Sequence, residues 1–118
     1  MRIHISDRRE DVDFPRAHQL LATTYWADKR TMEQFQTACA NSICFSLFAD
    51  GVFAGFARVV TDYATMFYVG DMIIAPEYRG RGLGTRLMER IMEDSRFSFA
   101  LGILLTDDLA ISEEFIKA

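Results

Sequence analysis

Hydrophobic residues recur at near-helical spacing in the first third of the chain, and this pattern predicts two helices. The stripe of the first helix consists of Phe14, Ala17, Leu20, Leu21 and Tyr25. Asp11 and Asp13 can cap this helix, and Pro15 suits its first turn. We expect it to end near Trp26. The second helix begins after Thr31, because a glutamine three positions later completes a capping box. Its inward-facing residues are Met32, Phe35 and Cys39.

Strand patterns occupy five segments of the chain, namely residues 2–6, 43–49, 52–61, 66–75 and 100–105. The second and third segments meet at Asp50-Gly51, a pair that readily adopts the positive φ angles of a tight hairpin turn. The fourth segment ends at Pro76, because proline donates no backbone hydrogen bond.

A central amphipathic helix is predicted over residues 83–94, and a last helix over 109–117. The apolar side of the central helix carries Leu83, Leu87, Met88, Ile91 and Met92. The resulting order, β-α-α-β-β-β-α-β-α, favours parallel pairing of the two strands that flank the central helix. Residues 1–118 therefore form a single mixed α/β domain, with a central mixed sheet flanked by helices.

Composition narrows the function classes. The chain is 50% hydrophobic and 25% charged, as expected of a globular domain and not of a disordered one. Its formal charge of −4 argues against nucleic acid as a partner. Cys39 and Cys44 are interpreted as reduced, apolar fillers, and His4 and His18 lie apart from any metal-ligand cluster. With no signal peptide or membrane span in the pattern, we expect a soluble cytoplasmic protein.

The segment between the fourth strand and the central helix carries the candidate chemistry. It reads Arg79-Gly80-Arg81-Gly82-Leu83-Gly84-Thr85. Glycines permit close approach of a ligand to the backbone, and a helix N-terminus supplies free N–H donors and partial positive charge. A phosphate or pyrophosphate suits such a loop. The spacing fits neither a dinucleotide G-x-G-x-x-G motif nor a Walker loop.

These residues resemble the pyrophosphate-binding motif R/Q-x-x-G-x-G/A of the GNAT superfamily of N-acetyltransferases. Arg79, Gly82 and Gly84 match the motif, and the run from Ile73 to Tyr78 before it is also similar. The resemblance extends to the order of elements along most of the chain. It implies the GNAT fold, acetyl-CoA as co-substrate, and transfer of the acetyl group to a primary amine of a small molecule or peptide.

The resemblance also implies how acetyl-CoA would bind. The pyrophosphate would be held by the backbone amides of Arg79, Gly80, Arg81, Gly82, Leu83, Gly84 and Thr85. Main-chain groups of Met72, Ile73 and Ile74 would pair with the pantetheine arm like an added strand. A splay between this strand and residues 100–105 would admit the thioester. The side chains of Arg81 and Arg86 either attract the nucleotide phosphates or are solvated surface charges.

The expected reaction is direct attack of a neutral amine on the thioester, with the oxyanion held by a backbone N–H near Ile74. Asp71 is the candidate base or water-orienting group, and the alternative is that it serves as a structural hydrogen-bond acceptor. The resemblance places acceptor-lining segments at two pairs of neighbouring residues, Tyr25-Trp26 and Asp62-Tyr63, whose aromatic rings would suit an alkyl or aryl amine. Alternatively, these side chains only complete the core.

Two departures from the family pattern affect the expected function. Phe115 stands where many members carry a proton-donating tyrosine, and the chain stops at Ala118, before the last two strands of the family. An uncovered strand edge at residues 100–105 would favour a homo-oligomer. The alternatives to an enzyme are an acetyl-CoA-binding protein with little or no transferase activity and a structural interaction module without CoA affinity.

Overall fold

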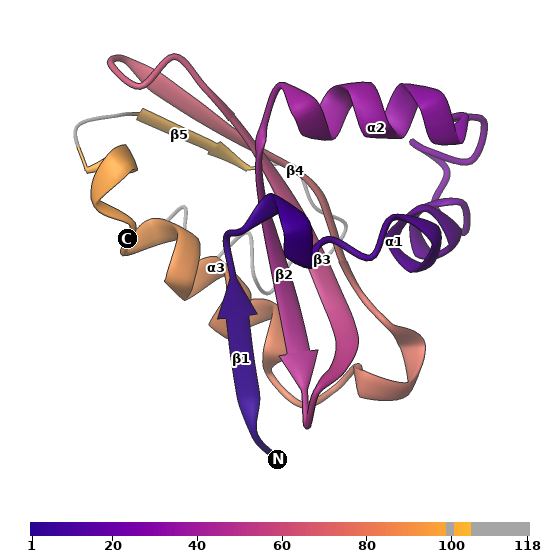
Figure 1. Ribbon diagram of the computed structural model, residues 1–118. Coiled ribbons are helices and arrows are strands. Elements are labelled where there is room, and N and C mark those ends of the chain that lie inside the picture. The colour runs from indigo at the N-terminus through magenta and orange to yellow at the C-terminus, as the bar shows by residue number, and fades with distance from the viewer. Residues whose placement is uncertain (99–100, 105–118) are drawn as a thin grey trace.

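A five-stranded sheet runs through the molecule, with α1 and α2 on one face and α3 on the other (Figure 1). The computed structural model describes residues 1–98 and, for the backbone alone, 101–104. The elements are β1 (Ile3–Ser6), α1 (Phe14–Leu21), α2 (Met32–Ala40), β2 (Ile43–Ala49), β3 (Val52–Thr61), β4 (Met66–Ile74), α3 (Leu83–Met92) and β5 (Leu101–Leu104). Short 3-10 helices lie at Arg9–Asp11, Pro76–Tyr78 and Ser95–Phe97. Within the described residues, no helix has the length and apolarity to cross a membrane.

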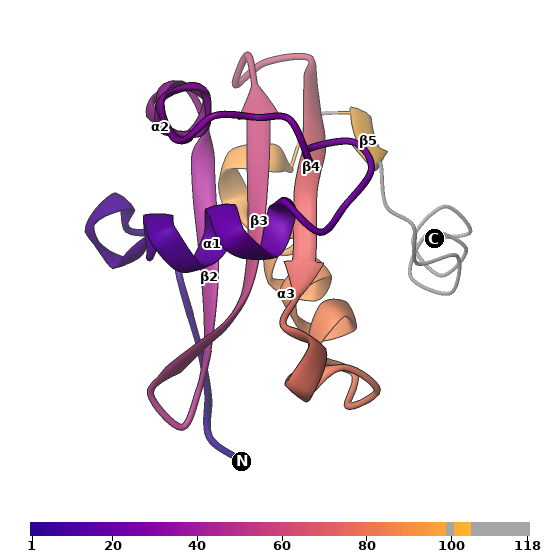
Figure 2. The same ribbon diagram turned by 90° about the vertical axis from the view of Figure 1, so that its right-hand side faces the viewer.

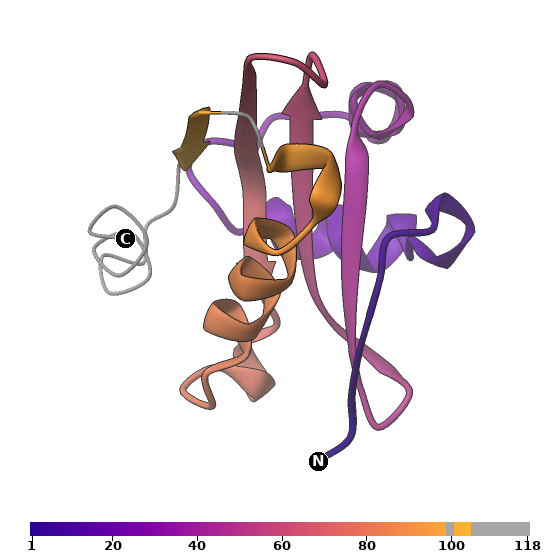
Figure 3. The ribbon, with the colours of Figure 1, turned by 90° about the vertical axis from the view of Figure 1, so that its left-hand side faces the viewer.

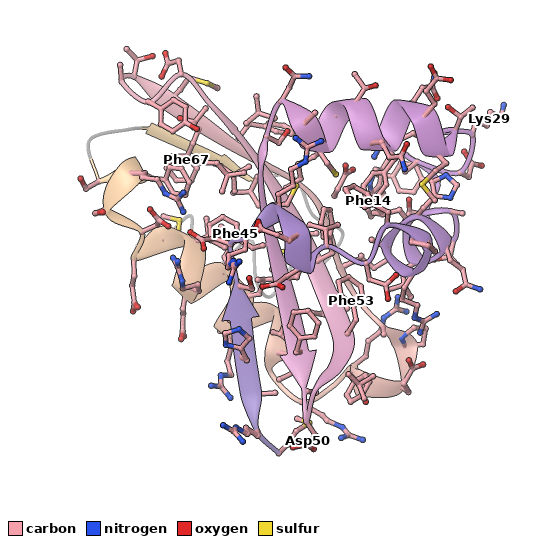
Figure 4. The ribbon with its side chains drawn as sticks, viewed as in Figure 1. Phe14, Lys29, Phe45, Asp50, Phe53 and Phe67 are labelled. Carbon is pink, nitrogen blue, oxygen red and sulfur yellow. The ribbon has the colours of Figure 1, made fainter. Side chains whose placement is uncertain are left out.

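The strands lie in the sheet in the order in which they occur along the chain. The first four pair antiparallel, and β5 pairs parallel with β4 across the α3 connection. This confirms the predicted mixed sheet and the parallel pair. The hairpin between β2 and β3 is also confirmed: Asp50 has φ 50° and Gly51 has φ 81°. Asp50 marks the tip of that hairpin in Figure 4.

Each face of the sheet has its own hydrophobic core. Leu83, Leu87, Met88 and Ile91 of α3 pack on one face with strand residues that include Phe45 and Phe67, both labelled in Figure 4. Ala17, Leu20, Leu21, Phe35 and Cys39 of α1 and α2 pack on the other face. Figures 2 and 3 show these faces in turn, with α1 crossing in front of the strands in one and α3 in the other. Helices therefore cover both faces of the sheet.

A β-bulge interrupts the pairing of β4 with β3. Two residues of β4, Asp71 and Met72, lie opposite the single residue Ala57 of β3. A bulge bends its strand and increases the local twist. β5 pairs only with residues 66–69 of β4, so in the described part of the chain residues 70–74 have no strand partner on that side. The two parallel strands are thus paired along one half of β4 and unpaired along the other.

The first helix is shorter than the pattern predicts. It ends at Leu21, and Tyr25, predicted to belong to its buried stripe, is 78% exposed on the following loop. The hydroxyls of Thr23 and Thr24 donate to the carbonyls of Leu20 and Leu21 at 2.7 Å. Such local side-chain bonds compete with the next helical turn and end the helix.

Smaller corrections concern the C-terminal half. β4 ends one residue earlier than expected, at Ile74, and α3 ends at Met92 instead of residue 94. Met92, predicted for the apolar side, is 42% exposed. Ile91 is the last residue of α3 that belongs to the core, and Met92 lies beyond it. The predicted helix at residues 109–117 lies outside the described residues.

Candidate functional site

A cavity of about 640 Å³ lies where the α1–α2 loop, the end of β4 and the start of α3 meet. Its walls are formed by Thr23, Thr24, Tyr25, Trp26, Met72, Ile73, Ile74, Tyr78, Arg79, Gly80, Gly82, Leu83, Gly84 and Thr85. Most of the predicted cofactor residues and one of the two predicted acceptor pairs therefore line a single cavity. These segments are far apart in the sequence, and the sheet brings them together.

The loop before α3 presents an unusual series of free donors. Gly80 and Gly82 have φ values of 78° and 74°, in the left-handed region that glycine adopts without steric cost. From Gly80 to Thr85, no backbone N–H forms a hydrogen bond to any described residue, and the first helical bond is that of Arg86 N to Gly82 O. A Cβ added at Gly80 or Gly82 would meet no atom within 4 Å. The loop thus combines open space, free donors and the positive end of a helix, which suits a phosphate group.

Arginine side chains surround this loop in different ways. Arg79 folds back, and its Nε donates to the carbonyl oxygen of Ile74 at 2.9 Å. The guanidinium of Arg81 lies over the ring of Tyr78, 5.7 Å from its centroid. Arg81 and Arg86 are exposed, and Arg81 does not line the cavity. Attraction of the nucleotide phosphates by Arg81 and Arg86 therefore stays a prediction, beside the alternative that both are solvated surface charges.

The unpaired edge of β4 forms a second wall of the cavity. Ala75 N donates to the carbonyl oxygen of Ala54 in β3. Because the backbone N–H and C=O groups of successive strand residues point to opposite sides, those of Ile74 point away from β3. The bond from Arg79 to the carbonyl of Ile74 agrees with that direction. An extended ligand that carries amide groups can pair with such an edge as an added strand.

Asp71, the candidate base, lies behind this edge and does not line the cavity. It is 5% exposed. Its Oδ2 accepts hydrogen bonds from Arg30 Nη1 at 2.7 Å and from Arg58 Nε at 2.8 Å. This geometry favours the alternative reading of Asp71 as a structural acceptor, and its role as a base stays a prediction.

The second predicted acceptor pair, Asp62 and Tyr63, is on the β3–β4 turn. The nine residues of β4 lie between this turn and the cofactor loop, a length of about 30 Å at normal strand rise. Asp62 accepts backbone bonds from Ala64, Thr65 and Met66. Hydrogen bonds from the hydroxyl and the backbone N–H of Thr65 hold the pKa of Asp62 well below its usual range, and the bonds from Ala64 and Met66 act in the same direction. Tyr63 is 62% exposed. The structure thus does not bring this pair together with Tyr25 and Trp26.

The sequence model of the Acetyltransferase (GNAT) family matches residues 11–109. The chain belongs to the GNAT acetyltransferase family. The family assignment confirms the resemblance that the glycine-rich loop indicated, and the sheet with its helices is the GNAT fold. No metal-ligand cluster of three or more His, Cys, Asp or Glu side chains occurs among the residues described here.

Solved structures support this GNAT assignment. A GNAT-family protein from Xanthomonas campestris pv. campestris is 32% identical, and the alignment covers 100% of this chain and 84% of that one with a TM-score of 0.90. A GNAT acetyltransferase from Elizabethkingia anophelis, solved with acetyl-CoA bound, is 13% identical over 98% and 72% of the chains, with a TM-score of 0.69. The ribosomal-protein-S18-alanine N-acetyltransferase from Escherichia coli is 21% identical over 97% and 76%, with a TM-score of 0.76. The last two show the fold alone. No curated protein sequence matches the chain.

Three cavity residues of this GNAT domain escaped the sequence reasoning: Thr23, Thr24 and Tyr78. The two threonines gave no signal, because they were assigned to a helix that in fact ends before them. Tyr78 directly precedes the motif arginine and packs against both cores. Its position beside the motif was the one signal that could have identified it.

Proposed function

We propose that this GNAT domain binds acetyl-CoA and transfers the acetyl group to a primary amine of a small molecule or peptide. The observation that carries the proposal is the series of free N–H donors from Gly80 to Thr85 beside the unpaired edge of β4, in one cavity. The donors suit the pyrophosphate, and the edge suits the two amides of the pantetheine arm. The acetyl-CoA-bound structure of the Elizabethkingia protein is consistent with this assignment.

The proposed chemistry is direct acyl transfer without a covalent enzyme intermediate. The amine nitrogen attacks the thioester carbon, the C–S bond breaks, and the thiolate of CoA takes up a proton. We assign the N–H of Ile74 as the donor to the oxyanion, because it faces the unpaired edge. A carboxylate or a water molecule would accept the proton of the amine.

The proposed acceptor site adjoins the aromatic part of the cavity wall. Tyr25 and Trp26 form an edge-to-face pair with ring centroids 5.3 Å apart and line the cavity opposite the β4 edge. Aromatic walls suit an alkyl or aryl amine. The assignment of Asp62 and Tyr63 as further acceptor residues stays a prediction. The cytoplasmic location of the protein is a separate prediction.

The decisive experiment is calorimetric titration with acetyl-CoA of the wild type and of Gly82→Trp. The indole would fill the space beside the free donors, so we expect affinity to fall by about 100-fold or more, the worth of two or three charge-assisted hydrogen bonds. Gly51→Trp is the matched control, because Gly51 also has positive φ and open space around it but does not line the cavity. Equal binding by all three proteins, or none by the wild type near a millimolar, contradicts the proposal.

The alternative is an acetyl-CoA-binding protein with little or no transferase activity. Phe115, at the position of the family's proton-donating tyrosine, favours it, and this residue lies outside the described residues. A thiol is a far more acidic leaving group than an alcohol and can leave as the thiolate without a general acid, so turnover stays compatible with phenylalanine. Release of free CoA that depends on an added amine supports the enzyme. Saturable binding without release across a broad amine panel supports the binding protein.

A further inference from the structure

A buried ion cluster lies directly behind the unpaired edge of β4. It consists of Asp71 in the bulge, Arg58 of β3 and Arg30 at the end of the α1–α2 loop. One oxygen of Asp71 accepts from both guanidinium groups, at 2.7 Å from Arg30 and 2.8 Å from Arg58. The cluster therefore joins two strands to the loop that carries Tyr25 and Trp26.

Arg30 is held at two places. Its guanidinium bonds to Asp71, and its backbone carbonyl accepts a hydrogen bond from Nε2 of His18 on α1 at 2.7 Å. Earlier in the same loop, Ala27 is buried in the core between the sheet and the first two helices. Packing fixes the loop at Ala27, and the Arg30–Asp71 bond adds a polar attachment to β4 three residues further on.

Charge explains why Asp71 is central to the cluster. Two guanidinium groups share one carboxylate, and Arg58 also donates to Ser42 Oγ at 3.1 Å. Loss of the carboxylate charge would leave two half-buried cations facing each other, which repel at low effective dielectric. Arg58 is held by β3 and Ser42, so the loop residue Arg30 is the partner that would move.

The backbone of Asp71 adds a second observation. Its φ is 54°, an uncommon value for a residue with a side chain, and such strain persists where the surroundings over-determine it. The next three residues of β4, Met72, Ile73 and Ile74, form the cavity wall. The same residue thus sets the course of the β4 edge and anchors the loop across the cavity from it.

From this we infer that Asp71 is a positioning residue, which holds the α1–α2 loop at the distance from the β4 edge that acyl transfer requires. Arg30 transmits the constraint to Tyr25 and Trp26. The inference rests on the proposed acetyl transfer and assigns Asp71 no proton transfer of its own. A misplacement of about 1 Å can cost a reaction about 100-fold in rate, so a fixed loop is functionally significant.

Trp26 is the single tryptophan of the chain and reports directly on this loop. We expect Asp71→Asn to raise the acrylamide quenching constant of Trp26 about twofold, because the loop loses its anchor. Asparagine tolerates positive φ, so acetyl-CoA affinity by calorimetry should stay within about threefold. Acetyl-CoA should protect Trp26 from quenching in the wild type and much less in the variant. Retained affinity with lost protection separates positioning from general destabilisation.

Three variants test the assignment to the cluster. Arg30→Gln should reproduce the effect of Asp71→Asn, the double variant should be no worse than either, and Arg30→Lys should restore most of the protection. Asp28→Asn is the matched control, since this exposed loop carboxylate has no hydrogen bond or ion pair among the described residues.

Each outcome decides one question. Unchanged Trp26 quenching in Asp71→Asn, or parallel loss of protection and acetyl-CoA affinity, overturns the positioning role. Absence of acetyl-CoA binding in the wild type overturns the proposed function instead. For any amine that the wild type acetylates, we expect kcat to fall about 10-fold or more in Asp71→Asn, with the KM for acetyl-CoA unchanged.

Discussion

Ser46 lies in the middle of β2 with a fully buried side chain, and its hydroxyl has no hydrogen-bond partner among the described residues. A buried hydroxyl without a partner costs free energy, because its bonds to water are lost on folding. We therefore expect Ser46→Ala to raise the free energy of unfolding by roughly 0.5–1 kcal/mol in urea denaturation.

Ser42→Ala is the matched control for Ser46→Ala. The hydroxyl of Ser42 donates to Ala38 O at 2.7 Å and accepts from Arg58. The same substitution should therefore lower the free energy of unfolding, by about 1 kcal/mol. Destabilisation of similar size in both variants would indicate that Ser46 has a partner after all.

The two cysteines show a different role for small buried side chains. Cys39 and Cys44 are free thiols, each buried at the contact of α2 with β2. The hydrogen bond with Cys39 and burial both raise the pKa of Cys44, so this thiol stays protonated at neutral pH. This fits the interpretation of Cys44 as an apolar filler.

At the scale of elements, the end of α3 is fixed by a carboxylate between two arginines. Asp94 accepts from Arg96 Nη2 at 2.7 Å and Arg90 Nη1 at 2.9 Å, and its other oxygen accepts the backbone N–H of Arg96. The bonds from Arg96 hold the pKa of Asp94 well below its usual range, against the opposing effect of burial. The charged form of Asp94 therefore stabilises the folded protein.

This shift makes the stability of the α3 end depend on pH. Since the folded-state pKa lies below the unfolded value of about 4, the contribution of Asp94 is complete above a pH of about 5 and is lost progressively as the pH falls from there through the folded-state pKa. We expect Asp94→Asn to lower the free energy of unfolding by about 1 kcal/mol at pH 7. Urea denaturation at pH 7 and pH 3 should show a smaller difference from the wild type at pH 3.

Asp7→Asn provides the comparison. Asp7 also pairs with Arg96, at 2.9 Å, but it is more exposed than Asp94, so its loss should cost less. A difference between wild type and Asp94→Asn that is as large at pH 3 as at pH 7 would contradict the assignment to the carboxylate charge.

At the scale of the whole molecule, self-association stays a prediction. β5 is the outermost strand of the described sheet on the side next to β4. An uncovered strand edge favours pairing with another chain. We expect light scattering at micromolar concentration to give a mass above the 13.5 kDa of one chain. A clean monomer would contradict the prediction.

Most of the fold could be predicted because its signals are local. The β2–β3 hairpin follows from a two-residue turn, and β2 and β3 have the predicted bounds. The α2 capping box follows from Thr31 and Gln34, both of whose bonds are present. The end of α1 was missed, because the competing hydroxyl bonds of Thr23 and Thr24 outweigh a hydrophobic spacing that continues to Tyr25.

The sequence by itself determined the glycine-rich loop, the helix that follows it and the GNAT family, since these depend on neighbouring residues in a fixed spacing. Only the tertiary structure decided that Tyr25 and Trp26 face the cofactor loop, that Asp62 and Tyr63 do not, and that Asp71 binds two guanidiniums. Arg30 and Asp71 are 41 positions apart, and they meet because the sheet and its helices pack around shared cores. A local pattern carries no information about which distant residue packing will place beside it.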